Sequence, residues 1–255
     1  MGLLSKIFQF GQEKIDEIER RMEGRYTLNP NLPIKIKIKD RPSLKQIKIV
    51  NISRGGIKLS LIDTQSLVNL GDQFDFECSI EDHHFDFTAK IVYIDNKDFE
   101  LNKTLYLGML IIHAHSGNLW PYYQVVYPII LGHSLVAIGK PKPCEENKEY
   151  EKIIHMGEFN SCLIFWHPKG QREDVDIIQF ELSVDHLLIY GNSKNHHLEL
   201  AEINPLTRVR KEQIEMPNKN DLKMAFKFFK WFLLHLNEQF PESTKNYLKS
   251  FSLKI

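Results

Sequence analysis

The sequence predicts a mainly β protein in two parts: a six-stranded antiparallel β-barrel preceded by a helix, and a smaller α+β domain with an antiparallel meander and C-terminal helices. Three observations support this prediction. Short apolar runs follow one another from residue 33 to 115 without a helix between them, the later half mixes such runs with helical patterns, and a Gly-Lys-Pro-Lys-Pro stretch separates the halves. We expect a helix over 1–22, a barrel with its arginine linker over 23–138, and an α+β domain over 148–255.

Composition excludes several classes of protein. With 255 residues, 42% of them hydrophobic and 26% charged, the chain is neither disordered nor fibrous. Its 33 basic and 33 acidic residues balance, so bulk charge does not indicate nucleic-acid or membrane binding. The three widely spaced cysteines favour reduced thiols. No apolar run approaches the roughly 18 residues of a membrane span, and the first residues lack a secretory signal. We expect a cytoplasmic protein.

The charge is unevenly distributed along the chain. Residues 1–60 hold 13 Lys and Arg against six Asp and Glu, whereas residues 61–100 hold two basic and ten acidic residues. One interpretation is a local anion-binding site in the basic block. The other is that the two blocks pair with each other in the fold.

The first segment, up to Met22, has a helical stripe of apolar residues that Gly11 interrupts. This helix either lies on its own domain or forms a weak dimer seam. Six β-type runs follow, separated by turn residues. They cover residues 34–39, 46–52, 56–62, 74–80, 85–94 and 104–112. A partly apolar stretch, Leu119 to Ile138, then leads to a loop over 139–147, where we place the domain boundary.

The second half reads as α+β. Four strands of a meander are expected at Cys162–Trp166, Asp176–Leu182, His186–Tyr190 and His197–Ile203. Asn220 or Asp221 can cap a helix that runs to about Glu238, and Pro241 suits the first turn of a last short helix. Five aromatic residues between 226 and 232 lie nearly all round the longer helix. We interpret them as core, with a partner or dimer interface as the alternative.

Two short motifs stand out before and inside the barrel. Arg21 and Arg25 form R-x-x-x-R, with Arg20 directly before it. Asn51, Ser53 and Gly56 form N-x-S-x-x-G in the turn between the second and third expected strands. Taken singly, the arginines are cations that favour a helix C-terminus, and the second motif is a good hairpin turn.

Together and in this order, the motifs resemble those of the PilZ domain, a bacterial receptor for cyclic di-GMP. Residues 89–94 and 106–111 look like later strands of that family. The resemblance covers roughly residues 20–118 and does not extend to 140–255. It implies that Arg20, Arg21, Arg25, Asn51, Ser53 and Gly56 bind cyclic di-GMP. We expect no other cofactor and, since no metal-ligand motif is found, no metal.

The chemistry of the ligand agrees with these residue types. Cyclic di-GMP carries two phosphates and two guanine edges with O6 and N7 acceptors, which the planar fork of arginine matches. Asn51 stands where the family more often has Asp, and its amide can bond a guanine edge. Gly56 allows a close backbone approach or a positive φ. Arg20 either helps to neutralise a stacked ligand dimer or is a solvated charge at a helix end.

The sequence therefore predicts a cytoplasmic bacterial cyclic di-GMP effector that is not an enzyme. Its protein partner is unknown, and a homodimer through the N-terminal or C-terminal helices is possible. The alternative is a PilZ-like adaptor that acts through protein contacts without nucleotide. A third class is an enzyme whose site in the C-terminal domain uses His186 or His197 with a nearby acid. His113 and His115 share one strand face but lack the spacing of a metal motif.

Overall fold

The computed structural model describes residues 24–39, 46–62, 68–95, 104–113, 119–145, 147–170, 176–204 and 219–253. These residues form two compact units, which divide between Tyr127 and Pro128. The division falls inside a helix, whereas the sequence analysis placed a boundary at the loop over 139–147. The expected helix over 1–22 lies outside the described residues.

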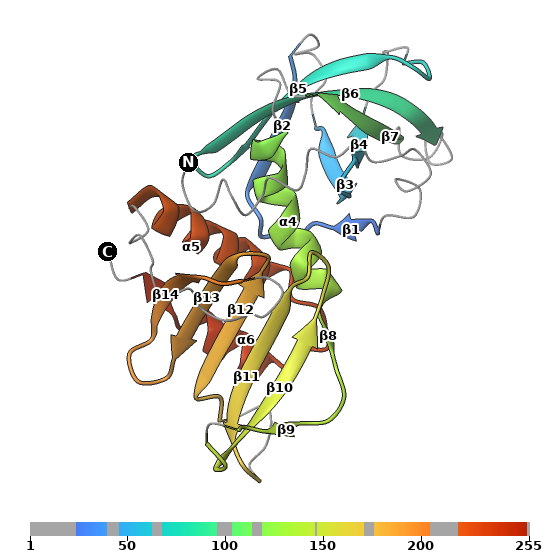
Figure 1. Cartoon of the computed structure of the whole chain (residues 1–255). Helices are drawn as coiled ribbons and strands as arrows, with labels where there is room; N and C mark the ends of the chain where they lie inside the picture. The colour runs from blue at the N-terminus through green and yellow to red at the C-terminus, as the bar shows by residue number, and fades with distance from the viewer. Residues whose placement is uncertain are drawn as a thin grey trace. The chain divides into compact units, whose positions relative to one another are not determined.

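The first unit is a mainly antiparallel sheet that curls into a half-barrel (Figure 1). Its strands are β1 (Tyr26–Thr27), β2 (Ile34–Ile38), β3 (Lys48–Ile52), β4 (Gly56–Ile62), β5 (Gln73–Ile80), β6 (His83–Asp95) and β7 (Thr104–His113). Along the sheet the strands follow the order β1-β3-β4-β7-β6-β5-β2, and every neighbouring pair is antiparallel.

The six expected strands are confirmed, but the expectation of a six-stranded barrel is corrected in two respects. A seventh strand, β1, adds to the edge of β3. In the described part of the chain, β1 and β2 stand at the two ends of the strand order. The sheet is therefore an open half-barrel. Strand β1 has only two residues and shows no strand pattern in the sequence, so it is a strand because it pairs with β3.

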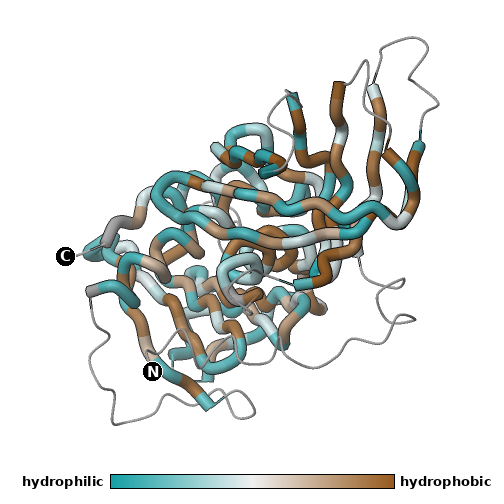
Figure 2. The backbone as a smooth tube through the Cα atoms, turned by 90° about the horizontal axis from the view of Figure 1, so that it is seen from above, coloured by the Kyte–Doolittle hydropathy of each residue, from teal (hydrophilic) through white to brown (hydrophobic). Residues whose placement is uncertain are grey.

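Alternation of apolar and polar residues determines which face of each strand is buried. In β5, Phe74, Phe76, Cys78 and Ile80 are buried and alternate with exposed or half-buried residues. Figure 2 shows this alternation as bands of brown and teal along the strands. Phe76 lies directly opposite Phe87 on β6, and their stacked rings are 5.1 Å apart between centroids. Burying such a side chain stabilises the fold by roughly 1.5–3 kcal/mol.

Helix α4 (Trp120–Ser134) was not expected from the sequence. It contains an interior proline, Pro128, and several β-branched residues, both of which disfavour helix. Burial overrides these propensities, because Tyr122, Val126 and Ile130 are at most 2% exposed. A helix that is apolar on all sides is typical of a protein core. Among the described helices, none combines the length and apolarity needed to cross a membrane.

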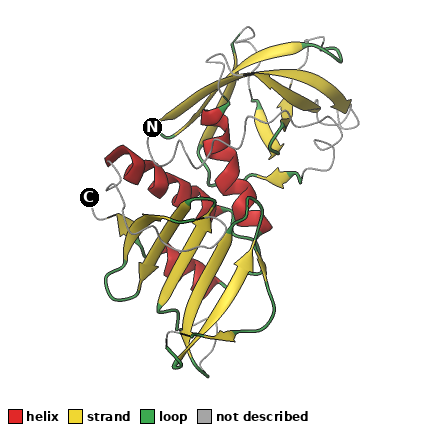
Figure 3. Ribbon diagram, in the orientation of Figure 1, coloured by secondary structure: helices red, strands yellow, loops and turns green. Residues whose placement is uncertain are grey.

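The second unit is an eight-stranded sheet with helices on one face (Figure 3). Its strands are β8 (Val136–Ala137), β9 (Lys142–Pro143), β10 (Tyr150–Met156), β11 (Cys162–Pro168), β12 (Gln179–Val184), β13 (Leu187–Asn192), β14 (His197–Glu202) and β15 (Ser252–Leu253). The antiparallel pairs from β11 to β14 confirm the expected meander. The second of its strands begins at Gln179 and not at Asp176, and β10 was not expected.

Two helices, α5 (Lys219–Leu234) and α6 (Glu242–Lys249), follow the meander. The first ends at Leu234, four residues earlier than the sequence indicated, and Pro241 is the N-cap of the second. Phe229 of α5 stacks on Phe180 of β12 with 5.4 Å between ring centroids. The interpretation of the aromatic residues as core is confirmed for four of the five, since Phe228, Phe229, Trp231 and Phe232 are buried, while Phe226 is half-buried.

Candidate ligand-binding site

Strand β1 brings the two sequence motifs together. Tyr26 lies opposite Ile52 and Thr27 lies opposite Asn51 on β3. Continuing this register by one residue places Arg25 across from Ser53. The last residue of R-x-x-x-R thus stands beside the first residues of the N-x-S-x-x-G turn, and its side chain is exposed.

Residues 53–55 form the turn that joins β3 to β4. The Ser53 amide donates to the Gly56 carbonyl at 2.9 Å, and the Ser53 hydroxyl donates to the same oxygen at 3.4 Å. From β7, the Ile111 amide donates to the Gly55 carbonyl at 3.0 Å. Each of these bonds satisfies a backbone carbonyl of the turn, so the turn has a defined shape without any ligand.

Gly56 is needed for a close approach of two strands. A Cβ at this position would lie 2.7 Å from the Met109 carbonyl oxygen of β7. The backbone of Gly56 is in a strand, and its φ is not positive. The expected positive φ is therefore wrong, and the close backbone approach that the structure shows at this glycine is to β7.

Asn51 and Ser53 flank a buried residue and therefore lie on the opposite face from it. Ile52 is 1% exposed and points into the half-barrel, whereas Asn51 and Ser53 are half-buried. The register of β3 against β4 shifts between Ile49 and Asn51, which inserts Val50 as a bulge. Bulges of this kind redirect a side chain next to a binding site.

Lys58 shares this face and was missed by sequence reasoning. It is the β4 partner of Asn51, and its ammonium nitrogen lies 5.0 Å from the centre of the Tyr106 ring. Residues directly opposite in an antiparallel pair have Cβ atoms about 5 Å apart. Lys58 is therefore the cross-strand neighbour of Asn51, while its ammonium group lies over Tyr106 of β7. The alternation of apolar and polar residues in the GIKLSLI run could have revealed it. Lys58 stands between two buried residues, Ile57 and Leu59, so its side chain lies on the opposite face of the strand.

Tyr122 is a buried residue that bonds to the turn, and sequence reasoning also missed it because it belongs to no recognisable motif. Its hydroxyl donates to the Ser53 carbonyl at 2.7 Å and lies 3.2 Å from the Gly56 carbonyl. The side chain is 2% exposed. The position of α4 against the half-barrel, which the sequence does not reveal, brings this hydroxyl to the turn.

The structure therefore brings Arg25, Asn51, Ser53 and Gly56 together at one edge of the half-barrel. Arg20 and Arg21 lie outside the described residues. The arrangement combines an exposed guanidinium, a side-chain amide and a hydroxyl around a hydrogen-bonded turn, with Lys58 on the neighbouring strand. Such a set can bind an anion that also carries hydrogen-bonding edges.

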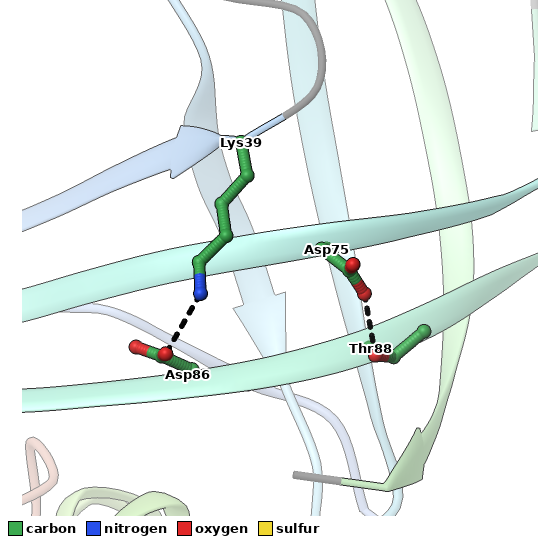
Figure 4. A network of polar contacts seen from close by, with 4 residues as sticks. All are labelled: Lys39, Asp75, Asp86 and Thr88. Carbon is green, nitrogen blue, oxygen red and sulfur yellow. Dashed lines mark hydrogen bonds and ion pairs between the residues drawn. The ribbon is translucent and has the colours of Figure 1, made fainter. Parts of the chain in front are cut away.

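Part of the charge polarisation is explained by pairing at the other edge of the sheet. Figure 4 shows Lys39, just after β2, with its ammonium group 2.8 Å from the Asp86 carboxylate on β6. The hydrogen bond to Asp86 raises the pKa of Lys39. In the same view Thr88 donates to Asp75 at 2.6 Å. The basic and acidic blocks thus meet where β2 lies beside β5. For these residues, the interpretation that the two blocks pair with each other in the fold is confirmed.

The other residues singled out in the sequence are placed as follows. The imidazole of His186 lies 3.9 Å from the Asp185 carboxylate, and burial raises the pKa of that carboxyl group. His197 begins β14 and His113 ends β7, while His115 lies outside the described residues. Over the residues that the structure describes, no three or more His, Cys, Asp or Glu side chains are placed to hold a metal ion.

Comparison with known proteins identifies the first part of the chain. Residues 19–109 match the family model of the PilZ domain. Searches of curated proteins and of solved structures found no match. The matched segment contains both motifs and the strands from β1 to β6, together with most of β7. The N-terminal part of this chain therefore carries a match to the PilZ domain, which implies a family of cyclic di-GMP receptors or PilZ-like adaptors.

Proposed function

We propose that this protein is a cyclic di-GMP effector that binds its ligand at the edge formed by β1, β3 and the β3–β4 turn. The observation that supports it best is the register of β1 on β3, which sets Arg25 across from Ser53. Two motifs that are 25 residues apart in the chain thereby meet at one place. The ligand is the one that the PilZ family binds.

Each residue has a distinct proposed role. Arg25 presents two parallel N–H groups to a phosphate or to the O6 and N7 atoms of guanine. Asn51 bonds a guanine edge through its amide, and Ser53 adds a hydroxyl. Lys58 supplies a point charge next to Asn51. Gly56 acts indirectly, because it lets β4 approach β7 and so determines the shape of the turn.

Arg20 and Arg21 complete the site in this proposal. The family resemblance assigns Arg21 to the ligand, and Arg20 offers a third guanidinium for a stacked pair of ligands. Ligand bound between these arginines and the turn would contact both motifs at once. The protein is then a binding protein whose output passes through its second unit or through a partner.

Titration calorimetry of the full-length protein with cyclic di-GMP tests the proposal. Replacing Arg25 with Ala removes a bidentate contact, and we expect a Kd weaker by about tenfold to a hundredfold. Arg25→Lys keeps the charge and loses the fork, so its Kd should lie between the two. Lys35→Ala is the matched control, because Lys35 is an exposed cation on β2 at the other edge of the sheet.

The outcomes separate ligand binding from the adaptor alternative. A folded wild-type protein that gives no heat with cyclic di-GMP would refute the proposal and favour an adaptor that acts without nucleotide. Equal weakening in Arg25→Ala and Lys35→Ala would indicate a general charge effect and not this site. Binding should also slow amide exchange at Tyr26, Thr27 and Asn51–Gly56 and leave the strands β11 to β13 unchanged.

A further inference from the structure

The buried hydroxyl of Tyr122 holds both ends of the ligand-binding turn. It donates to the Ser53 carbonyl at 2.7 Å, and the Gly56 carbonyl is 3.2 Å away. A phenol has a single proton, so the two carbonyls share it. They are the first and last carbonyls of the segment that contains the S-x-x-G part of the motif.

The ring of Tyr122 is positioned independently of this hydrogen bond. It packs against Phe85 and Phe87 of β6, with ring centroids 6.3 Å and 5.7 Å away. These contacts belong to the core of the half-barrel, where Phe87 is fully buried. Removing the hydroxyl alone therefore leaves the ring in place and removes the two hydrogen bonds that it makes to the turn.

Other hydrogen bonds of the turn lie within it or run to β7. The Gly56 carbonyl accepts from the Ser53 amide, and the Gly55 carbonyl accepts from the Ile111 amide. The first bond lies within the turn, and the second ties it to β7. The hydroxyl of Tyr122 adds a bond to the helix, and its loss leaves buried acceptor groups less well satisfied.

We propose that Tyr122 is a positioning residue for the ligand site and that it links occupancy of the turn to helix α4. This inference rests on the proposed function and adds a route by which binding is sensed. If the ligand prefers the turn as Tyr122 holds it, binding must stabilise the packing of α4 by the same free energy. Within the second unit the same helix continues to Gly132, where a Cβ would lie 2.7 Å from the His235 backbone near the end of α5.

The first test compares Tyr122→Phe with Tyr123→Phe in the full-length protein. Both variants remove one hydroxyl from the same helix, but the ring of Tyr123 stacks on Tyr127 with 5.3 Å between centroids. We expect Tyr122→Phe to weaken the Kd for cyclic di-GMP about three- to tenfold. Tyr123→Phe should stay within about twofold of the wild type. Equal Kd values for wild type and Tyr122→Phe would overturn the inference.

The second test is a readout that a merely structural role would not change. In the free protein, amide exchange at Ser53 and Ile111 should be faster in Tyr122→Phe, while amides of β5 keep their wild-type rates. Added ligand should slow exchange along α4 after Tyr122 in the wild type but not in Tyr122→Phe. Faster exchange throughout the half-barrel with unchanged ligand affinity would mean that Tyr122 is structural only, and would refute the link.

These experiments distinguish the two proposals. Absence of binding by the wild type would overturn the proposed function and this inference together. Binding by the wild type, with Kd and α4 exchange unaffected by Tyr122→Phe, would leave the proposed function standing and overturn the inference alone.

Discussion

Replacing Gly56 with Ala should destabilise the half-barrel even when no ligand is present. The added Cβ would lie 2.7 Å from the Met109 carbonyl oxygen, well inside the 3.4 Å at which ordinary contact begins. The obstacle is backbone, so a rotamer change cannot relieve it, and β4 must move away from β7. Overpacking of this kind costs about 1–3 kcal/mol.

Native-state amide exchange measures this cost within one unit of the protein. A global unfolding curve does not, because it combines the unfolding of both units. A loss of about 1–3 kcal/mol makes exchange through unfolding roughly fivefold to 150-fold faster in β4 and β7. Ser60→Ala on the same strand is the control, because Ser60 is half-buried and its change should stay within about 0.5 kcal/mol. Wild-type exchange rates in ligand-free Gly56→Ala would refute this reasoning and indicate that the glycine serves the ligand alone.

Two further predictions concern the second unit and the stoichiometry of binding. Burial, with His133 nearby, lowers the pKa of His235 to about 4 from its ordinary 6.5, so the unfolded chain binds its proton first as the pH falls. In a Trp120→Phe background, where the remaining Trp166 and Trp231 both lie in this unit, urea unfolding followed by tryptophan fluorescence should show stability that is complete above pH 6.5 and falls by up to about 3 kcal/mol toward pH 4. His235→Gln should flatten the slope to what His155 contributes, since burial also lowers the pKa of that group; an unchanged slope would contradict the assignment. In titration calorimetry the wild type should bind two cyclic di-GMP molecules per chain and Arg20→Leu one, and a wild-type stoichiometry of one would reduce Arg20 to a surface charge.

The candidate site contains two kinds of residue: those in short sequence motifs, and one whose role depends on a contact with a residue far away in the chain. Arg25, Asn51, Ser53 and Gly56 were proposed from the resemblance to a family whose two motifs are short local patterns. Tyr122 could not be found in this way. Its contact with Ser53 joins residues 69 positions apart, and nothing near it in the chain distinguishes it from the two other tyrosines of α4.

Much of the fold could be predicted because it follows from patterns within short stretches of the sequence. The six long strands of the half-barrel alternate apolar and polar residues with period two, and that alternation sets which face is buried whatever the neighbours are. The meander from β11 to β14 was recognisable for a similar reason, since its short apolar runs are bounded by turn residues. The aromatic stretch of α5 predicted a buried helix, and Trp231 is 1% exposed.

Tertiary structure decided the elements whose local pattern is weak or contradictory. Strand β1 exists only because it pairs with β3. Likewise β8 and β9 are two-residue strands that pair with the longer β10, and β15 is a two-residue strand that pairs with β14. Helix α4 contains an interior proline, and the free energy of burying its apolar residues outweighs its poor propensity. The sequence alone thus determined the six long strands of the half-barrel, the meander and the motifs, because alternation and turn chemistry act over a few residues. The meeting of Arg25, Ser53 and Tyr122 at one turn required long-range pairing and packing, which no short window of sequence contains.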